Sequence, residues 1–394
     1  MARRGGNADR WPRRIRESAF AVLTHGVFDN PPASGLRDFL VQRGARVTFV
    51  VHPLQAEHGD VHHVVEYADG RELRRRSHRL APRPPLTFAT DLLTPVWPAA
   101  VDGWFGFNNL LAARGIAARR LGRADRVVYW AVDFVPDRFG EGSRLSRAYD
   151  RLDEWVCRRA DWRVDLSPPA LAGRTERHGL HRGPAAPGRV VPVGVWLDRT
   201  PRVPDDGWRA GRVVFLGHLV PRQGVDRLIR AVALARRDGA ALELEIAGNG
   251  PQEGELRALA DAEGVAEHVR FLGFISDHTE VEAFLASGSV AAAPYETSAD
   301  SFTRFADPSK LKSYLAAGLP IVLTDVPHNA AELAERAGAE VAAFEPRALA
   351  DSLRRCLESP EGWGARRAAA LAYARGFDWS TVLGAGLADM GFVE

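Results

Sequence analysis

The sequence predicts an α/β protein made of two Rossmann-like domains, each built on a doubly wound parallel sheet. Short apolar runs alternate with amphipathic stretches along both halves of the chain, which is the pattern of strands joined by helices. With 394 residues, 46% of them hydrophobic, the chain is long enough to bury two cores. A segment rich in Pro, Asp and Gly at 198–211 separates the two halves and is the best candidate for a linker.

In the first half, the run "SAFAVLTHG" predicts a buried strand at 18–26, followed by a helix at 34–45 and a strand at 46–53. Further elements follow the same rhythm: strands are expected at 62–68, 101–107, 126–134, 162–167 and 189–196, and helices at 109–122 and 144–160. Because helices join successive strands, the sheet should be parallel, with its ligand crevice beyond the carboxyl ends of the strands.

The second half repeats this alternation more clearly. Strands are predicted at 212–220, 241–248, 269–274, 289–295 and 320–325, and helices at 224–239, 252–264, 277–288 and 308–318, with a terminal helix at 377–392. We therefore expect four parts: a flexible basic leader (1–16), an N-terminal acceptor domain (17–198), a C-terminal donor domain (199–375) and a terminal helix packed on the N-terminal domain (376–394). Two facing domains of this kind create a deep cleft for a small molecule.

Composition excludes several classes of protein. The apolar run "AFAVL" after the basic start is too short for a signal peptide or a membrane span. Two cysteines without ligand spacing predict no metal site and a reduced, cytoplasmic compartment.

Residues 1–198 carry 31 Arg against 22 acids, but no aromatic-and-basic motif accompanies them, so we expect no nucleic acid partner. Peripheral contact with an anionic membrane stays open, and the oligomeric state is not indicated.

The lysines are unusual. Of 52 basic residues only Lys310 and Lys312 are lysine, and both lie in "DPSKLKSYLAAG". A strong arginine bias resembles proteins of GC-rich bacterial genomes. Lysines that persist under such a bias are candidates for a phosphate pocket, because a compact ammonium fits it differently from a planar guanidinium. A chance position on a helix surface is the alternative.

Two turns qualify as anion sites, because the free N–H groups at a helix N-terminus attract phosphate. In "GHLVPRQG", residues 217–224, the two terminal glycines permit close approach and Arg222 supplies charge. In "ADPSKLKSYLAAG", Pro308 suits the first helical turn, Asp307 is the expected cap, and the amides of Ser309 and Lys310 should point out of the helix end. Either turn alone is also an ordinary start of a helix.

Together and in order, "GHLVPRQGVDRLIRAVALA", "LEIAGNGP", "VRFLGF", "AAAPYE" and "KLKSYLAAGLPIVLTD" resemble the donor-binding domain of the retaining GT-B glycosyltransferases of family 4. The resemblance is strong over 211–335 and weaker in the first half, where "VVYWAVDFVPDRF" carries it. It implies a GT-B fold, with the terminal helix crossing back, and binding of a nucleotide-diphosphate sugar without a cofactor or a metal. Together with the two anion turns, it gives these candidate donor-binding residues: Gly35, His218, Arg222, Gln223, Gly248, Gly273, Phe274, Ile275, Asp307, Ser309, Lys310, Leu311 and Ser313.

The chain departs from the family pattern at four of its positions. His218 and Gln223 replace the Arg and Lys that hold the diphosphate; Phe305 and Ser313 replace the two acidic residues, eight positions apart, of the EX7E motif. We interpret this as an atypical subgroup with a rebuilt pocket, in which Arg222, Lys310 and Lys312 restore the lost charge. Asp307, Asp300 or Glu296 would replace the missing acid, with Asp307 the best placed.

In the N-terminal domain the resemblance matches a glycine-rich loop to "THGVFDNPPASG", so that His25, Ser34 and Gly35 should approach the donor phosphates. It places Asp133 at the catalytic face, where this carboxylate would orient or deprotonate an acceptor. Its alternative role is to cap the following loop. The candidate catalytic residues are thus Asp133 and His25.

The function implied is a retaining, metal-independent glycosyltransferase that passes a sugar from a nucleotide diphosphate to a small-molecule or lipid-linked acceptor, as in the biosynthesis of a specialised metabolite. Two alternatives remain. A GT-B relative with non-transfer chemistry, such as a sugar-nucleotide epimerase or a pseudo-glycosyltransferase, would explain the altered diphosphate grip. A catalytically silent nucleotide-sugar-binding module would explain it equally.

Overall fold

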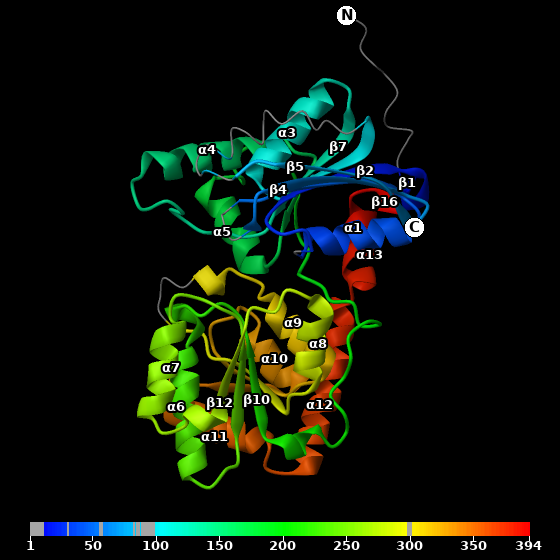
Figure 1. Ribbon diagram of the computed structural model, residues 1–394. Helices are drawn as coiled ribbons and strands as arrows, with labels where there is room; N and C mark the ends of the chain where they lie inside the picture. The colour runs from blue at the N-terminus through cyan, green and yellow to red at the C-terminus, as the bar shows by residue number, and fades with distance from the viewer. Residues whose placement is uncertain are drawn as a thin grey trace, which may run out of the picture. The chain divides into compact units, whose positions relative to one another are not determined.

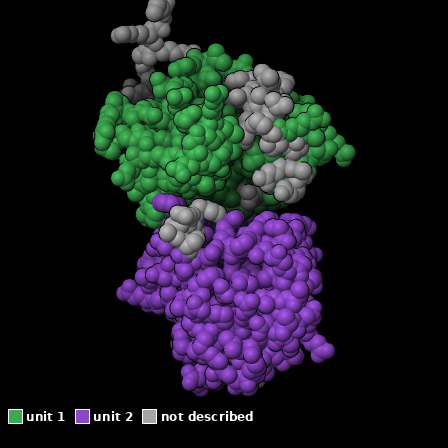
Figure 2. All heavy atoms as spheres, turned by 90° about the vertical axis from the view of Figure 1, so that its left-hand side faces the viewer, with its two compact units in different colours: residues 1–193, 379–394 green, residues 194–378 purple. Residues whose placement is uncertain are grey.

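The computed structural model describes residues 12–394 apart from 30, 55–57, 82, 84–86, 88–98 and 298–301. The chain forms two compact units, which are coloured separately in Figure 2. Unit 1 comprises residues 1–193 together with 379–394, and unit 2 comprises residues 194–378. The boundaries therefore lie at 193/194 and 378/379, a few residues from the predicted 198/199 and 375/376.

Unit 1 is organised around one twisted sheet with the strand order β5-β4-β3-β2-β6-β7-β8-β9. Neighbouring strands pair in parallel along the part of the sheet with the order β3-β2-β6-β7-β8-β9, as predicted. The bounds are β2 Ala19–His25, β3 Arg46–His52, β4 Val61–Ala68, β5 Arg71–Arg79, β6 Val101–Gly106, β7 Ala124–Ala131, β8 Trp162–Asp165 and β9 Gly188–Val190. The last strand is shorter than the expected 189–196, because the chain leaves the sheet at Pro192.

One edge of this sheet differs from the prediction of a fully parallel arrangement. Strands β4 and β5 form an antiparallel hairpin, and β4 also runs antiparallel to β3. The strand β5 was not predicted, because its sequence "RELRRRSHR" has no apolar face and all its residues are exposed. It pairs through its backbone with β4, which supplies the buried residues Val64 and Val65.

Helices cover both faces of the sheet in unit 1 (Figure 1). On one face α3 (Asn109–Arg120) and α4 (Arg144–Cys157) bury a cluster that includes Trp104 and Tyr129. On the other face α1 (Ala33–Gln42) packs against β2, β3 and the terminal helix α13 (Trp379–Asp389). A further helix, α5 (Pro168–Arg177), lies beside β8 and β9.

The start and the end of the described chain meet in unit 1. β1 (Arg13–Arg14) pairs in parallel with β16 (Phe392–Val393), and Arg13 forms an ion pair with Asp102. A 3-10 turn, η2 (Ile15–Glu17), follows and buries Ile15. Residues 13–16 therefore do not belong to a flexible leader, because backbone pairing, an ion pair and a buried side chain hold them; residues 1–11 of the predicted leader lie outside the described residues.

Gly35 is fixed by its contact with α13. It lies inside α1, where an added methyl group would come within 2.5 Å of Cε2 of the buried Trp379 ring. We therefore expect Gly35→Ala to lower the free energy of unfolding by about 1–3 kcal/mol in urea denaturation. Gly364→Ala in a helix of unit 2 is the matched control, because its methyl group would meet nothing within 4 Å; it should raise the same quantity by about 0.4–1 kcal/mol. Equal stability of both variants would contradict the packing argument.

Unit 2 has a parallel sheet with the order β12-β11-β10-β13-β14-β15 and helices on both faces (Figure 1). One core joins β10 to α6, α7 and α11, and the other joins the sheet to α8, α9, α10 and α12. The strands are β10 Arg212–Leu216, β11 Glu243–Ala247, β12 Val269–Gly273, β13 Val290–Ala293, β14 Ile321–Thr324 and β15 Glu340–Ala342. The helices are α6 Val225–Arg237, α7 Glu253–Ala262, α8 His278–Ala286, α9 Ser309–Ala317, α10 Ala330–Ala337, α11 Pro346–Cys356 and α12 Pro360–Ala374.

Every strand and helix predicted for 212–325 is present in unit 2. The structure adds α10, β15, α11 and α12, which the sequence analysis left unassigned, and several short 3-10 turns. η5 (Pro221–Gln223) lies between β10 and α6, and η7 (Phe302–Arg304) precedes α9. The other turns of this unit are η4 (Gly207–Ala210), η6 (Ala266–His268) and η8 (Arg375–Phe377).

Candidate donor site

The carboxyl ends of β10, β11 and β12 come together through three glycines. The backbone N–H of Gly217 donates to the carbonyl of Ala247, and that of Gly248 donates to the carbonyl of Gly273. All three glycines have positive φ angles, +151°, +141° and +73° in chain order. A side chain on Gly248 would lie 1.9 Å from the carbonyl oxygen of Gly217, so only glycine fits there. Gly248 and Gly273 are among the predicted donor-site residues, and Gly217 belongs to the predicted anion turn. The structure places the three side by side at the carboxyl ends of neighbouring strands.

Lys310 and Gln223 meet directly beside this edge. The Nζ atom of Lys310 donates to Oε1 of Gln223 over 2.6 Å, although the residues are 87 positions apart. A side chain at Gly217 would lie 3.4 Å from this Nζ and 3.5 Å from this Oε1. The lysine of α9 thus lies against the residue that replaces the expected lysine of the turn.

Aromatic side chains enclose the lysine. Its Nζ lies 4.3 Å from the ring centre of Phe215 at the end of β10 and 4.6 Å from that of Tyr295 after β13. Such contacts with ring faces favour a cation. Burial nevertheless lowers the pKa of Lys310 from 10.5 to about 7, because removal from water penalises the charged form. Among the ion pairs of the described residues none involves Lys310, so its charge depends on Gln223 and the rings alone.

Lys312 has a different role from Lys310. Its ammonium forms an ion pair with the carboxylate of Asp307, and both side chains are almost fully buried. His328 adds its Nε2 atom 4.0 Å from the same carboxylate. The N-cap of α9 is Pro308, which makes no side-chain capping bond, so the prediction that Asp307 caps this helix is wrong. The carboxylate turns toward Lys312 instead, because a buried charge needs an opposite charge.

The remaining donor-site predictions lie around the same strand ends. His218 and Arg222 are exposed on the turn, and the carbonyl of Arg222 accepts from the N–H of Glu296. Phe274 is 68% exposed after β12, with Ile275 partly buried beside it. On α9, Ser309 is exposed, Leu311 is buried and the hydroxyl of Ser313 donates to the carbonyl of Ser309. Asp300 falls outside the described residues.

The candidates of unit 1 lie on separate elements: His25 ends β2, Asp133 follows β7, and Ser34 and Gly35 lie in α1. His25, the last residue of β2, contacts the side chain of Asn108, which also caps α3. Gly35 is not in an open loop but faces Trp379 within unit 1, and Ser34 is buried in the same helix. Asp133 follows β7 and forms an ion pair with Arg138, and its carbonyl accepts from Nη2 of Arg174.

Sequence reasoning missed several residues that contact the candidates of the two units. Phe215 and Tyr295 flank Lys310, and Arg174 and Asn108 support Asp133 and His25. A signal existed for Tyr295 and Asn108, because Tyr295 ends one predicted strand and Asn108 follows another. Both are at the carboxyl end of a strand, the edge where ligands bind in such sheets. No local signal marks Arg174, because its partners come from distant strands and helices.

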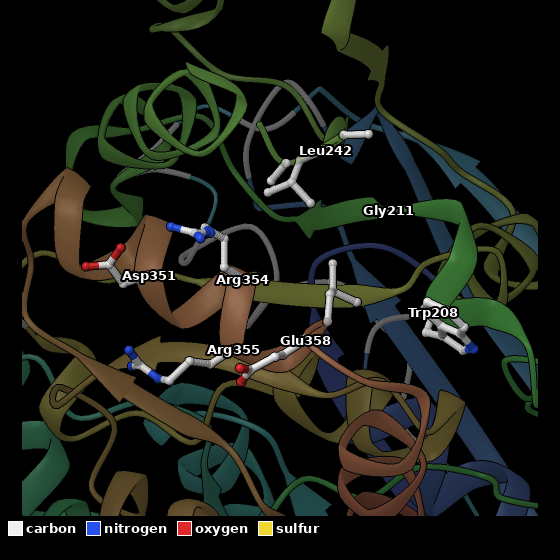
Figure 3. A pocket seen from close by; sticks show the side chains of 10 residues that line it. Trp208, Gly211, Leu242, Asp351, Arg354, Arg355 and Glu358 are labelled. Carbon is white, nitrogen blue, oxygen red and sulfur yellow. The ribbon is translucent and has the colours of Figure 1, made fainter. Parts of the chain in front are cut away.

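One cavity of unit 2 lies away from these strand ends. It has a volume of about 540 Å³ and is lined by residues that include Trp208, Gly211, Leu242, Arg354 and Glu358. Figure 3 shows side chains of α11 reaching it from one side and Trp208 from the other. Gly211 and Leu242 directly precede β10 and β11, so this cavity is at the amino ends of the strands, opposite the glycines described above. It contains none of the predicted donor-site residues.

The described residues provide neither a metal cluster nor a helix that could cross a membrane. Within the described ranges, no group of three or more His, Cys, Asp or Glu side chains has the geometry to hold a metal ion. Among the helices of the described chain, none combines the length and the apolar character needed to cross a bilayer. The cysteines Cys157 and Cys356 are both free and buried.

Comparison with known proteins identifies the domain that carries the donor-site candidates. Residues 210–359 match the family model "Glycosyl transferases group 1". A GDP-mannose-dependent alpha-(1-6)-phosphatidylinositol monomannoside mannosyltransferase of Mycobacterium tuberculosis is 41% identical over 128 residues, which cover 29% of this chain and 32% of the relative. The chain thus spans about a third of the length of this curated relative.

Solved structures match over nearly the whole chain. The sucrose-phosphate synthase of Thermosynechococcus elongatus has a TM-score of 0.68 at 17% identity, covering 94% of this chain and 98% of the other. The Anabaena protein HepE, solved in complex with UDP-glucose, has a TM-score of 0.64 at 18% identity and covers 95% and 99%. At such identities the likeness establishes the fold, which is the predicted two-domain α/β fold of the GT-B type.

Proposed function

We propose that this chain, whose residues 210–359 match the glycosyl transferases group 1 family, is a retaining, metal-independent glycosyltransferase that uses a nucleotide-diphosphate sugar. One observation carries the proposal: a buried lysine without a carboxylate partner in the described chain lies beside the glycine turn at the strand ends of unit 2. A buried cation normally has a counter-ion. The diphosphate of the donor would be that counter-ion.

In this proposal the chemistry is electrostatic. As the bond between the sugar and the diphosphate breaks, negative charge grows on the leaving phosphate. The ammonium of Lys310 and the free N–H groups at the start of α9 would stabilise that charge. Gly217, Gly248 and Gly273 leave space for the donor to approach the backbone. The acceptor would enter on the face from which the diphosphate departs, so that the sugar keeps its anomeric configuration without a covalent intermediate.

The acceptor would be bound by unit 1. Asp133 is the best candidate to orient its hydroxyl, because this carboxylate is partly exposed and is held by Arg138. His25, fixed by Asn108, is the second candidate. The curated relative is named for a lipid-linked acceptor, a phosphatidylinositol monomannoside. That name supports a lipid-linked glycan acceptor over an unrelated small molecule, and we place the reaction in the cytoplasm, where the free cysteines stay reduced.

The test is incubation of the full chain with GDP-mannose and UDP-glucose, the two sugar nucleotides named for the similar proteins. A transferase should release the nucleoside diphosphate slowly without acceptor and rapidly with a phosphatidylinositol mannoside, and the new linkage should retain the donor's configuration by NMR. The rate should not change with EDTA. Interconversion of the sugar at C2 would instead identify an epimerase, and tight binding without turnover would identify a silent module.

A further inference from the structure

The environment of Lys310 is nearly free of permanent charge. Its Nζ contacts the neutral amide of Gln223 and the rings of Phe215 and Tyr295. The ion pair of Asp307 with Lys312, on the loop before α9 and on α9 itself, is internally balanced. The other titratable groups on the turn, on the segment after β13 and on α9 itself are His218, Arg222, Glu296, Tyr295 and Tyr314. The helices packed against α9 add His278, Glu280 and Glu282 on α8 and Glu361, Arg366, Arg367 and Tyr373 on α12, and none of these forms an ion pair with Lys310 in the described part of the chain.

None of these groups fixes the charge of Lys310. Burial raises the pKa of the Tyr295 and Tyr314 hydroxyls, so they remain neutral near pH 7. Arg222 is exposed, so water screens its charge, and His218 is exposed on the same turn. No ion pair joins Glu296 to Lys310 among the described contacts. Burial alone lowers the pKa of Lys310 to about 7. At neutral pH the site therefore contains both ammonium and neutral amine.

A diphosphate placed against Nζ would change this balance. Two negative charges near a buried amine favour its protonated form strongly, because the surroundings screen them poorly. The neutral amine binds phosphate far less well, since it lacks the charge that makes such a hydrogen bond strong. Binding of the anion and protonation of the amine must therefore favour each other.

We propose that the nucleotide-sugar donor binds together with one proton, which Lys310 takes up from solvent at its Nζ atom. The balance is simple: the free amine and a solvent proton give an ammonium, and the ammonium pairs with a diphosphate oxygen. No bond of the donor breaks in this step. The inference rests on the proposed function, since it requires the diphosphate to lie at Lys310. Gln223, a neutral acceptor at the expected lysine position, holds the ammonium without fixing its charge.

This coupling gives the site a pH dependence of defined sign. Below pH 7 Lys310 is already protonated, so donor affinity should be constant. Above pH 7 the proton must be supplied on binding, so the dissociation constant should rise by up to about tenfold for each pH unit. A site built on two permanently charged side chains would not behave in this way over pH 6–9.

The decisive experiment is calorimetric titration of the full chain with GDP-mannose and with UDP-glucose at pH 8 in two buffers of different ionisation enthalpy. Nucleotide sugars suit the test because both phosphates are esterified and do not titrate near pH 7, whereas a free nucleoside diphosphate has a terminal phosphate that titrates near pH 6. The heat should differ between buffers by the amount that corresponds to uptake of nearly one proton. At pH 6 the difference should almost vanish.

Two variants assign the proton. Lys310→Met should abolish proton uptake together with the pH dependence of the remaining affinity. Arg257→Met should leave the uptake at pH 8 unchanged, because Arg257 is exposed on α7, pairs with Glu253 and lies outside the candidate donor site. If a donor binds at pH 8 with the same heat in both buffers, no proton is taken up and the inference is wrong. The proposed function would remain intact, because the donor binds. Failure of both donors to bind at any pH would count against the proposed function itself.

Discussion

Replacing Lys310 with methionine should weaken binding of a nucleotide-sugar donor by roughly tenfold to a hundredfold at pH 6.5, where the wild-type amine is mostly charged. The expected loss corresponds to one hydrogen bond between an ammonium and a phosphate, about 1.5–3 kcal/mol. Calorimetry or displacement of a fluorescent nucleotide measures it. Methionine keeps the length and the apolar stem of the side chain, so that the contacts with Phe215 and Tyr295 survive.

The same variant should not unfold the protein. In the folded state the pKa of Lys310 lies near 7, below its ordinary 10.5, so the folded protein binds fewer protons than the unfolded chain between these values. The wild-type free energy of unfolding therefore gains a contribution that rises from pH 7 to pH 10. Lys310→Met lacks this rise. The free energy of unfolding of the variant minus that of the wild type should therefore be greatest near neutral pH and should decline as pH increases.

Arg257→Met is the matched control for donor binding. Arg257 is exposed on α7 of the same unit and pairs with Glu253 one helical turn away. Its removal should leave donor affinity within about twofold of the wild-type value. A single exposed ion pair contributes at most about 1 kcal/mol to folding, and this pair takes no part in donor binding. If Lys310→Met bound donors as well as Arg257→Met does, the diphosphate would not lie at Lys310.

Replacing Arg174 with methionine should lower the free energy of unfolding by about 3–5 kcal/mol, the largest stability loss that we expect in unit 1. Arg174 is buried in α5 and donates to the carboxylates of Asp153 and Asp165. Burial tends to raise the pKa of Asp153, but Arg174 and His178 outweigh it and hold that pKa well below its usual range. Without the guanidinium, two buried carboxylates would lose their main counter-ion.

Arg177→Met on the same helix provides the control for this prediction. Its guanidinium pairs with Asp137 and Asp150 but is 28% exposed, so water already screens the pairs. Chemical denaturation of unit 1 should show a loss of less than about 1 kcal/mol for this variant. A similar, small effect of Arg174→Met would mean that the buried network contributes little to folding.

Local periodicity predicted much of the fold, and the exceptions have a common cause. The strand and helix patterns of 212–325 are strongly apolar and regular, and each of those elements is present. The strand β5 has no such pattern, since its conformation follows from pairing with β4 rather than from its own side chains. The helix α12 carried a usable signal, because Ser359 precedes a proline and caps the helix through the N–H of Gly362.

The candidate site was predicted only as far as residue type and order allow. The scarcity of lysine makes Lys310 a candidate from the sequence alone, but its contact with Gln223 joins residues 87 positions apart and requires the fold. Sequence could not separate the two lysines, because their roles depend on the direction in which α9 presents each side chain. Lys310 faces the strand ends, whereas Lys312 turns toward Asp307, a contact that requires the preceding loop to fold back on the helix.

The arginine-rich strand β5 has a consequence for how copies of this protein meet. It is the last strand of its sheet in the described part of the chain (Figure 1), and its side chains are exposed on both faces. An edge strand with apolar side chains would invite another chain to extend the sheet, which is a common start of aggregation. Charges such as Arg71 and Arg74 repel an identical strand laid alongside them. The arginines that deprive β5 of an apolar pattern thus also oppose pairing of this edge with the same strand of a second copy.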